Sequence, residues 1–312
     1  MNTPLRARAS THHRALLIAP ETSALHKSNT NRNLYLFMLE EDLHHQHYAY
    51  KAGIGYEGIE HTRGDDIISS LLHELDYHRG RDGFRLFTQL VSTVACDHLT
   101  HGKCIFELFS EDEGGDSTPR LGILPGWSLR KHWRKTLQVG SNSGKLTWQE
   151  IPESALVEFH IPDRLEKALR RTKERLQVID KYRPGDFNML TSTSSTGYEF
   201  SAHKRTLDEI SAQATKEIGW DGRGLFLSRA TDSYRTYRRL RFLHTWLTIV
   251  SATTSTLNRI FANPTVNGGT PFTVHTTGLP TIEQVEHDMA AVTAGTKPLG
   301  DIFNRTLQPR YR

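Results

Sequence analysis

The chain has 312 residues, 37% of them hydrophobic, a formal net charge of +4 and a pI of about 9.0, which suits one large domain or two smaller ones. Its most apolar run, residues 243–257, contains His244 and several Thr and Ser and is shorter than the roughly 20 apolar residues of a membrane span, so we expect no transmembrane helix and no membrane partner. Residues 15–19 are too short for a secretory signal and two cysteines give no disulfide framework, so we expect a protein that stays in the cytosol.

The first half of the chain predicts helices followed by a small sheet. Residues 1–33 are polar and lack a period, which predicts a flexible arm. The apolar spacing predicts a helix over 66–78, capped by Asp65 or Asp66, and a second helix over about 82–101 that ends at Gly102. After Gly102 the period changes to two, and strands are expected over 103–109, 120–124, 146–151 and 155–161, with an acidic turn over 111–117.

The second half is predicted to be mostly helical. Asp163 and Glu166 form a capping-box pattern after Pro162 and predict a basic helix to about Tyr182, with a Ser/Thr-rich loop over 191–197 after it. Further helices are expected over 201–218 and 233–261, separated by a glycine-containing loop, and a short strand over 272–275 precedes a last helix that ends near Gly295. The predicted fold class is therefore α+β, mostly helical, with a small mixed sheet and one long helix.

The expected long helix over 233–261 carries two adjacent apolar stripes. The first stripe holds Leu240, Leu243, Leu247, Val250, Thr254, Leu257 and Phe261. The second holds Phe242, Trp246, Ile249, Thr253, Thr256 and Ile260. One stripe is enough to dock a helix on its own domain, so the second places the helix either deep in a core or between its own subunit and a neighbour.

Positive charge is concentrated in two runs. The first holds Arg164, Lys167, Arg170, Arg171, Lys173 and Arg175, and the second holds Arg235, Arg238, Arg239 and Arg241. Such runs are usually solvated faces, and we take that as the default for both.

Three motifs resemble ligand-binding sites, but the residues around them do not support that interpretation. The glycines of 53–58 match a dinucleotide-binding turn, but residues 44–51 before them are too polar for a buried parallel strand. Cys96, His98, His101 and Cys104 are metal-ligand types that would not converge on one helix, and the histidines at 44, 45 and 47 suit an exposed loop. No nucleophile elbow, phosphate-binding loop or zinc-protease helix is present. We therefore expect no catalytic residues, no metal and no cofactor.

The order of several segments and their local residue patterns resemble those of the portal proteins of tailed double-stranded DNA phages and prophages. Segments 99–108 and 121–125 resemble the family's helix that ends at a glycine and the two strands after it, and 144–162, with Ile151-Pro152 and Ile161-Pro162, resembles its closing strands. Segments 207–220, 257–260 and 278–281, with Gly295 downstream, are similar to its later helix ends and tail. The likeness covers about residues 85–300.

The resemblance implies a domain layout. It comprises an arm (1–33), a wing-like α/β domain (34–162), stem-like helices (163–218), a tunnel-loop-like segment with the long helix and a reduced crown (219–300), and a tail (301–312). The chain is short for the family, so a motor-docking clip and a conventional crown are the parts that the resemblance supports least.

The resemblance also implies a function and partners. About twelve copies would form a ring at one capsid vertex, and DNA would pass through its channel during packaging and ejection. The partners would be other copies, double-stranded DNA bound without sequence preference, the terminase motor, the major capsid protein and head-tail adaptors, and the protein would reside in the virion after assembly in the host cytoplasm.

Candidate residues follow from these roles. The candidate DNA-channel contacts are Arg223, Arg229, Lys167, Arg170, Arg171 and Lys173, because phosphates are met by cations. The candidate subunit-interface residues are Phe242, Trp246 and Ile249. Two alternatives stay open: a nucleic-acid-binding adaptor that uses the same basic helices as a monomer or dimer, and an enzyme whose site assembles from distant residues.

Overall fold

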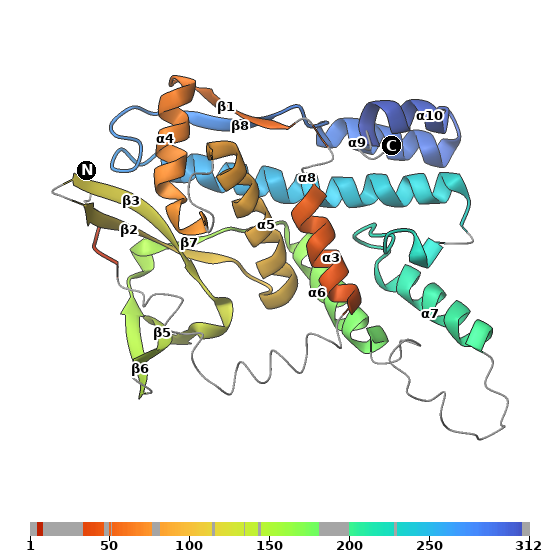
Figure 1. Ribbon diagram of the computed structural model, residues 1–312, viewed down its shortest axis with the longest axis horizontal. Coiled ribbons are helices and arrows are strands. Elements are labelled where there is room, and N and C mark those ends of the chain that lie inside the picture. The colour runs from red at the N-terminus through yellow and green to blue at the C-terminus, as the bar shows by residue number, and fades with distance from the viewer. Residues whose placement is uncertain are drawn as a thin grey trace. The chain divides into compact units, whose positions relative to one another are not determined.

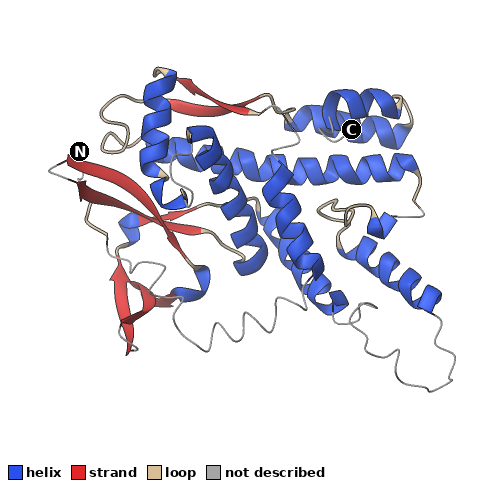
Figure 2. Cartoon of the chain, in the orientation of Figure 1, coloured by secondary structure: helices blue, strands red, loops and turns tan. Residues whose placement is uncertain are grey.

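The computed structural model describes residues 5–8, 34–46, 50, 52–76, 82–113, 116–133, 135–142, 145–180, 200–227 and 230–307. Within these residues the fold is α+β, with helices and small antiparallel sheets (Figures 1 and 2). The chain divides into two compact units: the first holds residues 1–26, 50–162 and 248–279, and the second holds 27–49, 163–247 and 280–312. The division after Pro162 coincides with an expected domain boundary, whereas residues 34–49 and 248–279 are grouped differently from the expected layout.

The first unit contains the sheets and two helices. Its elements are β1 (Gly53–Glu57), α4 (His61–Leu71), η2 (His73–Leu75), α5 (Gly83–His101), β2 (Ile105–Glu113), β3 (Asp116–Leu124), η3 (Gly126–Ser128), β4 (Leu129–His132), β5 (Lys135–Asn142), β6 (Lys145–Ile151), η4 (Glu153–Ala155), β7 (Leu156–Glu158) and β8 (Thr273–Thr277).

Helix α5 begins and ends where its local sequence predicts. The side chain of Asp82 accepts a hydrogen bond from the backbone N–H of Arg85 at 2.8 Å, and Gly102 adopts the left-handed conformation with φ of 73°. Helix α4, in contrast, begins at His61 with Glu60 as its N-cap, so the predicted cap at Asp65 or Asp66 is wrong. Gly64, in the first turn of this helix, lies against the ring of Tyr56 on β1, a contact that a sequence period does not reveal.

Two three-stranded sheets follow α5. The first has the strand order β3-β2-β7 and the second has the order β4-β5-β6, and every named pair is antiparallel. A mixed sheet was expected. The short turns of β2–β3, β4–β5 and β5–β6 allow only antiparallel pairing, and β7, which is distant from β2 in sequence, pairs with it antiparallel as well. The β2–β3 ladder extends to Glu113↔Asp116, well into the expected acidic turn, and strands β4 and β5 were not predicted.

The glycine motif of 53–58 forms part of a strand. Strand β1 pairs with β8 in the register Gly53↔Thr277, so segments from opposite ends of the sequence lie side by side in Figure 1. A Cβ on Gly55 would lie 2.5 Å from Nε2 of His275 on β8, which explains the glycine by close approach rather than by phosphate binding. Residues 5–8, within the expected arm, contact β2, where the N–H of Ser110 donates to the carbonyl of Arg6 at 2.8 Å.

The second unit is helical. Its elements are α3 (Leu34–His45), α6 (Asp163–Asp180), α7 (Phe200–Ala214), η7 (Leu225–Leu227), α9 (Ile282–Ala294), α10 (Leu299–Ile302) and η8 (Phe303–Leu307), together with α8 (Asp232–Phe261) up to residue 247. The predicted helix at 163–182 is confirmed over 163–180, the last described residue of that segment. The long helix is confirmed to within one residue at each end, while α7 ends at Ala214 rather than 218. The Ser/Thr-rich loop predicted over 191–197 lies outside the described residues. None of the described helices is both long enough and apolar enough to span a membrane.

Candidate nucleic-acid interface

The segment between α7 and α8 is a compact loop, residues 215–227, which we call the clamped loop. Four of its residues have left-handed backbone conformations: Gly219, Gly222, Arg223 and Gly224. At Gly219 a Cβ would lie 2.4 Å from the backbone nitrogen of Phe242, so only glycine lets the loop approach α8 this closely. The tight course of the loop therefore depends on its glycines.

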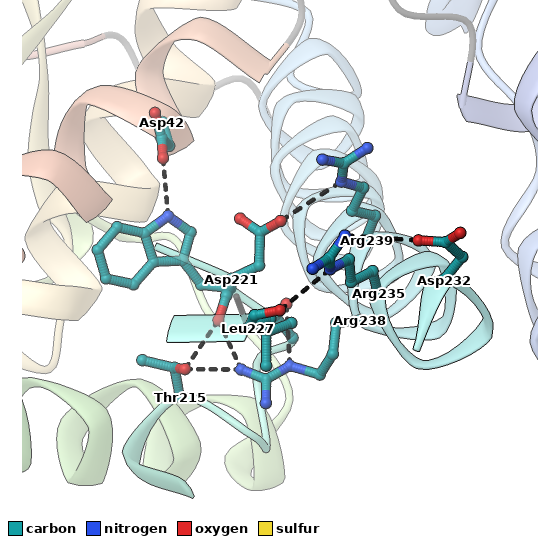
Figure 3. A network of polar contacts seen from close by, with 10 residues as sticks. Asp42, Thr215, Asp221, Leu227, Asp232, Arg235, Arg238 and Arg239 are labelled. Carbon is teal, nitrogen blue, oxygen red and sulfur yellow. Dashed lines mark hydrogen bonds and ion pairs between the residues drawn. The ribbon is translucent and has the colours of Figure 1, made fainter. Parts of the chain in front are cut away.

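Arg238, nearly two turns into α8, holds this loop (Figure 3). Its guanidinium is completely buried. It donates to the carbonyl oxygens of Ala212 (2.8 Å) and Trp220 (2.5 Å), to that of Gly219 (3.3 Å), and to the hydroxyl of Thr215 (2.6 Å). A buried cation must have its donors satisfied, and here the chain supplies mostly the carbonyls that a non-helical loop leaves free. Arg238 is thus the main polar anchor of the clamped loop.

Trp220 fastens the loop to α3. Its indole N–H donates to the carboxylate of Asp42 at 2.7 Å, and its side chain is 1% exposed. Its ring meets that of Phe226 edge-on at 5.4 Å, and Phe226 in turn contacts Tyr35 on α3 at 5.0 Å. Three aromatic rings in edge-to-face contact, with the polar N–H satisfied, form a small core beneath the loop.

The other three arginines of the second basic run also bind the loop. Arg235 donates to the carbonyl of Leu227 at 3.0 Å, and Arg241 donates to the carbonyl of Glu217 at 3.1 Å. Arg239, which is exposed, lies 3.3 Å from Asp221. The expectation of a solvated face is therefore wrong for Arg238, and the run as a whole shapes the loop because unpaired loop carbonyls require donors.

Arg223, a candidate channel contact, lies at the outer side of the clamped loop. Its Nη2 is 2.8 Å from Glu41 and its Nε is 2.9 Å from Asp42, and the hydrogen bond to Glu41 raises the pKa of the guanidinium. A DNA phosphate at this position would have to compete with two carboxylates on α3. Arg229, the second loop candidate, lies outside the described residues.

The candidates on α6 differ in their surroundings. Lys167, Arg170 and Arg171 are exposed on one side of the helix, opposite its buried positions. Arg171 forms an ion pair with Glu217 at 3.3 Å, next to the carbonyl that Arg241 binds. Lys167 and Arg170 therefore remain as the most accessible cations of this set.

Lys173 is half-buried and faces a carboxylate rather than open solvent. Burial raises the pKa of Glu40 on α3, and the positive charge of Lys173 opposes that rise. The ammonium group thus interacts with a carboxylate of its own chain, which makes Lys173 a weaker candidate for a phosphate contact than Lys167 or Arg170.

The candidate subunit-interface residues are already covered in the single chain. Phe242, Trp246 and Ile249 are 8%, 2% and 0% exposed. The second apolar stripe of α8 was expected either in the core or at a subunit boundary. These three side chains are buried within the single chain and offer almost no surface to a neighbouring subunit.

The metal-ligand motif does not assemble a site. Among the described residues, no three His, Cys, Asp or Glu side chains converge as a metal ion requires. The ring of His98 is buried and its Nε2 lies 2.6 Å from the carbonyl oxygen of Phe159. Cys104 is fully buried, and burial raises the pKa of its thiol.

Sequence reasoning missed Arg238, Trp220 and Asp42, which organise the loop. One signal for Arg238 was available: four arginines follow a loop with three glycines, and the carbonyls of such a loop need donors. The partnership of Trp220 with Asp42 spans most of the chain, so no local pattern could have revealed it. Comparison with protein-family models gives no match, and comparison with curated proteins finds no match either.

Proposed function

We propose that this chain is a subunit of a ring-shaped channel for double-stranded DNA, of the kind formed by the portal proteins of tailed phages. The observation that carries the proposal is the clamped loop, which occupies the place between a helix pair and the long helix where the resemblance expects a tunnel loop. Arg238 and Trp220 fix the course of this loop through buried hydrogen bonds, which suits a channel constriction of defined width.

The order of elements gives further support. A helix that ends at Gly102 leads into the antiparallel sheets, and α6 and α7 precede the loop and α8. This is the succession that the resemblance implies for wing, stem and long helix. The proposed role is mechanical: the protein guides DNA, in the virion and during assembly, and breaks no covalent bond.

The accessible cations of α6 suit the proposed contact with DNA. Lys167 and Arg170 lie one turn apart and can follow successive phosphates without reading bases. Such contacts are weak singly and strongly salt-dependent together, which permits the duplex to slide. A ring would multiply each contact by the number of subunits.

The proposal is tested by native mass measurement and negative-stain images of the purified chain, alone and co-expressed with capsid proteins. We expect a closed ring of about twelve subunits with a central hole. A monodisperse monomer or dimer under both conditions would overturn the proposal. If rings form, an R239M variant should still form them, because the contacts of Arg239 with Asp221 and with the ring of Phe303 lie within its own chain and are individually weak.

A further inference from the structure

The second sheet of the first unit, β4-β5-β6 with the preceding η3 turn, exposes three tryptophans. Trp127, Trp133 and Trp148 are 42%, 92% and 58% exposed, whereas Trp220 and Trp246 are almost fully buried. Tryptophan is normally among the more buried side chains, so three exposed indoles within 22 residues of sequence require an explanation. We call this surface the tryptophan sheet.

The same segment also carries a high net positive charge. Residues 127–150 contain five Lys or Arg and one Glu, a net charge of +4, which equals the net charge of all 312 residues. The rest of the chain is therefore neutral overall. By comparison, the basic helix α6 has a net charge of only +2, because acidic residues are interspersed.

The antiparallel register places aromatic and cationic side chains on one face. Arg130 pairs with Leu137, His132 pairs with Lys135 and Val139 pairs with Trp148, and paired residues point to the same side of a sheet. The opposite face holds buried residues such as Gln138 and Ile151. The outward face thus runs from the turn that carries Trp133, past cations, to Trp148.

The spacing on this face suits several nucleotides. The four steps of β5 from Lys135 to Val139 separate the turn from the row of Trp148 by about 14 Å. Arg130 is held in the row between them, since its Nη1 donates to the carbonyls of Trp127 (2.8 Å) and Leu129 (2.9 Å). Lys135, nearer the turn, is exposed and lies 2.6 Å from Glu150.

Trp133 occupies an unfavourable backbone position. It lies at the turn between β4 and β5 with φ of 56°, where glycine or asparagine is preferred, and a bulky residue there costs about 1–3 kcal/mol. At 92% exposure the indole gains little packing to offset this cost. Strain of this kind is typical of functional positions.

We propose that the tryptophan sheet binds single-stranded nucleic acid, with unpaired bases stacked on Trp133 and Trp148 and phosphates held by Arg130 and Lys135. Exposed aromatic faces interleaved with cations are the combination that binds unpaired strands, because every base can stack and every nucleotide carries a charge. An acidic protein could form ion pairs with the cations but would provide no stacking partner for the exposed indole of Trp133. A duplex would satisfy the cations but offers no free base faces along its length.

The test measures binding of the full chain to an oligothymidylate of about 15 nucleotides by fluorescence anisotropy, with a duplex of equal length and polyglutamate as comparisons. The single strand should bind most tightly and should quench the exposed tryptophans. Replacing one stacking residue should weaken binding about 5- to 150-fold, the range of measured base-aromatic contributions.

The decisive variant is W133G, because glycine relieves the backbone strain and should leave the hairpin folded or more stable. It should lose affinity for the single strand while retaining its unfolding midpoint. A matched control is F37A, which removes another exposed aromatic side chain, from α3, and should bind as the parent does. K135Q, on the outward face, should reduce the slope of log K against log salt by about 0.7.

Several outcomes would overturn the proposal: equal or tighter binding of the duplex or of polyglutamate, no binding of any of the three, or a W133G variant with unchanged affinity. Tight polyglutamate binding that W133G weakens would identify a docking surface for an acidic protein instead. None of these results depends on ring formation, which native mass measurement of W133G follows separately.

Discussion

Replacing Arg238 by methionine tests whether the clamped loop depends on one buried cation. Methionine fits the space of the aliphatic stem but removes every donor, so the carbonyl oxygens of Ala212, Gly219 and Trp220 lose a buried partner. A hydrogen bond to a charged group contributes about 1.5–3 kcal/mol, and an orphaned buried acceptor costs about 1–3 kcal/mol. These bonds share one guanidinium and are not additive, so we expect R238M to lower the free energy of unfolding by about 3–5 kcal/mol.

The matched control is the neighbouring residue, Arg239. Its guanidinium is half-exposed, pairs with the less exposed Asp221 and lies 5.8 Å from the ring centroid of Phe303, so R239M should cost about 1 kcal/mol. Urea titration gives both values, and hydrogen exchange locates the effect: amides of residues 215–227 should lose protection in R238M only. If R238M and R239M differ by less than about 1 kcal/mol, Arg238 does not anchor the loop, and the support that we draw from the loop's rigidity is lost.

The structure also makes three further predictions. G219A should destabilise the protein by about 2–4 kcal/mol, because its Cβ would meet the backbone of α8, whereas G224A, with open space around it, should cost about 1–2 kcal/mol in the same urea titration. Burial raises the pKa of Asp97 from 3.8 to about 6, so the folded state binds an extra proton between these values, and this group's contribution to stability is present below pH 4 and is lost as the pH rises through 6. D97N should therefore raise stability at pH 7.5 by up to roughly 3 kcal/mol and flatten its pH dependence; an unchanged pH profile would contradict this. If DNA contacts α6, the double substitution K167A/R170A should reduce the salt slope of duplex binding by about 1.8, and an unchanged slope would exclude these two residues from the interface.

Features of the fold that depend on residues close together in the sequence could be predicted. Asp82 and Gly102 mark the ends of α5, because caps act within one turn. The start of α4 and the pairing of β1 with β8 could not, since both depend on contacts made only in the fold.

The candidate site divides in the same way. The exposed positions of α6 follow from its apolar period, so Lys167 and Arg170 are found where the pattern puts them. Arg238 lies in a run of hydrophilic residues, yet it is buried. The loop carbonyls of Gly219 and Trp220 that it binds come from a segment without a regular sequence period. The turn at Trp133 could not be predicted, because it lacks the glycine or asparagine by which a tight hairpin turn is recognised in a sequence.

The pairing of β1 with β8 has a consequence for how the chain folds. Gly53 meets Thr277, and the second unit's residues 163–247 lie between the two parts of the first unit in the sequence. During synthesis β1 has no partner strand until most of the chain has been made. The loop between β1 and β8 is long, and closing a long loop is slow. Until then the edge of β1 is open to pairing with other chains, so expression at low temperature or with a chaperone should favour the native product over aggregates. A fragment cut after Pro162 would keep that open edge permanently, so the first unit should not be obtainable as an independent domain by truncation there.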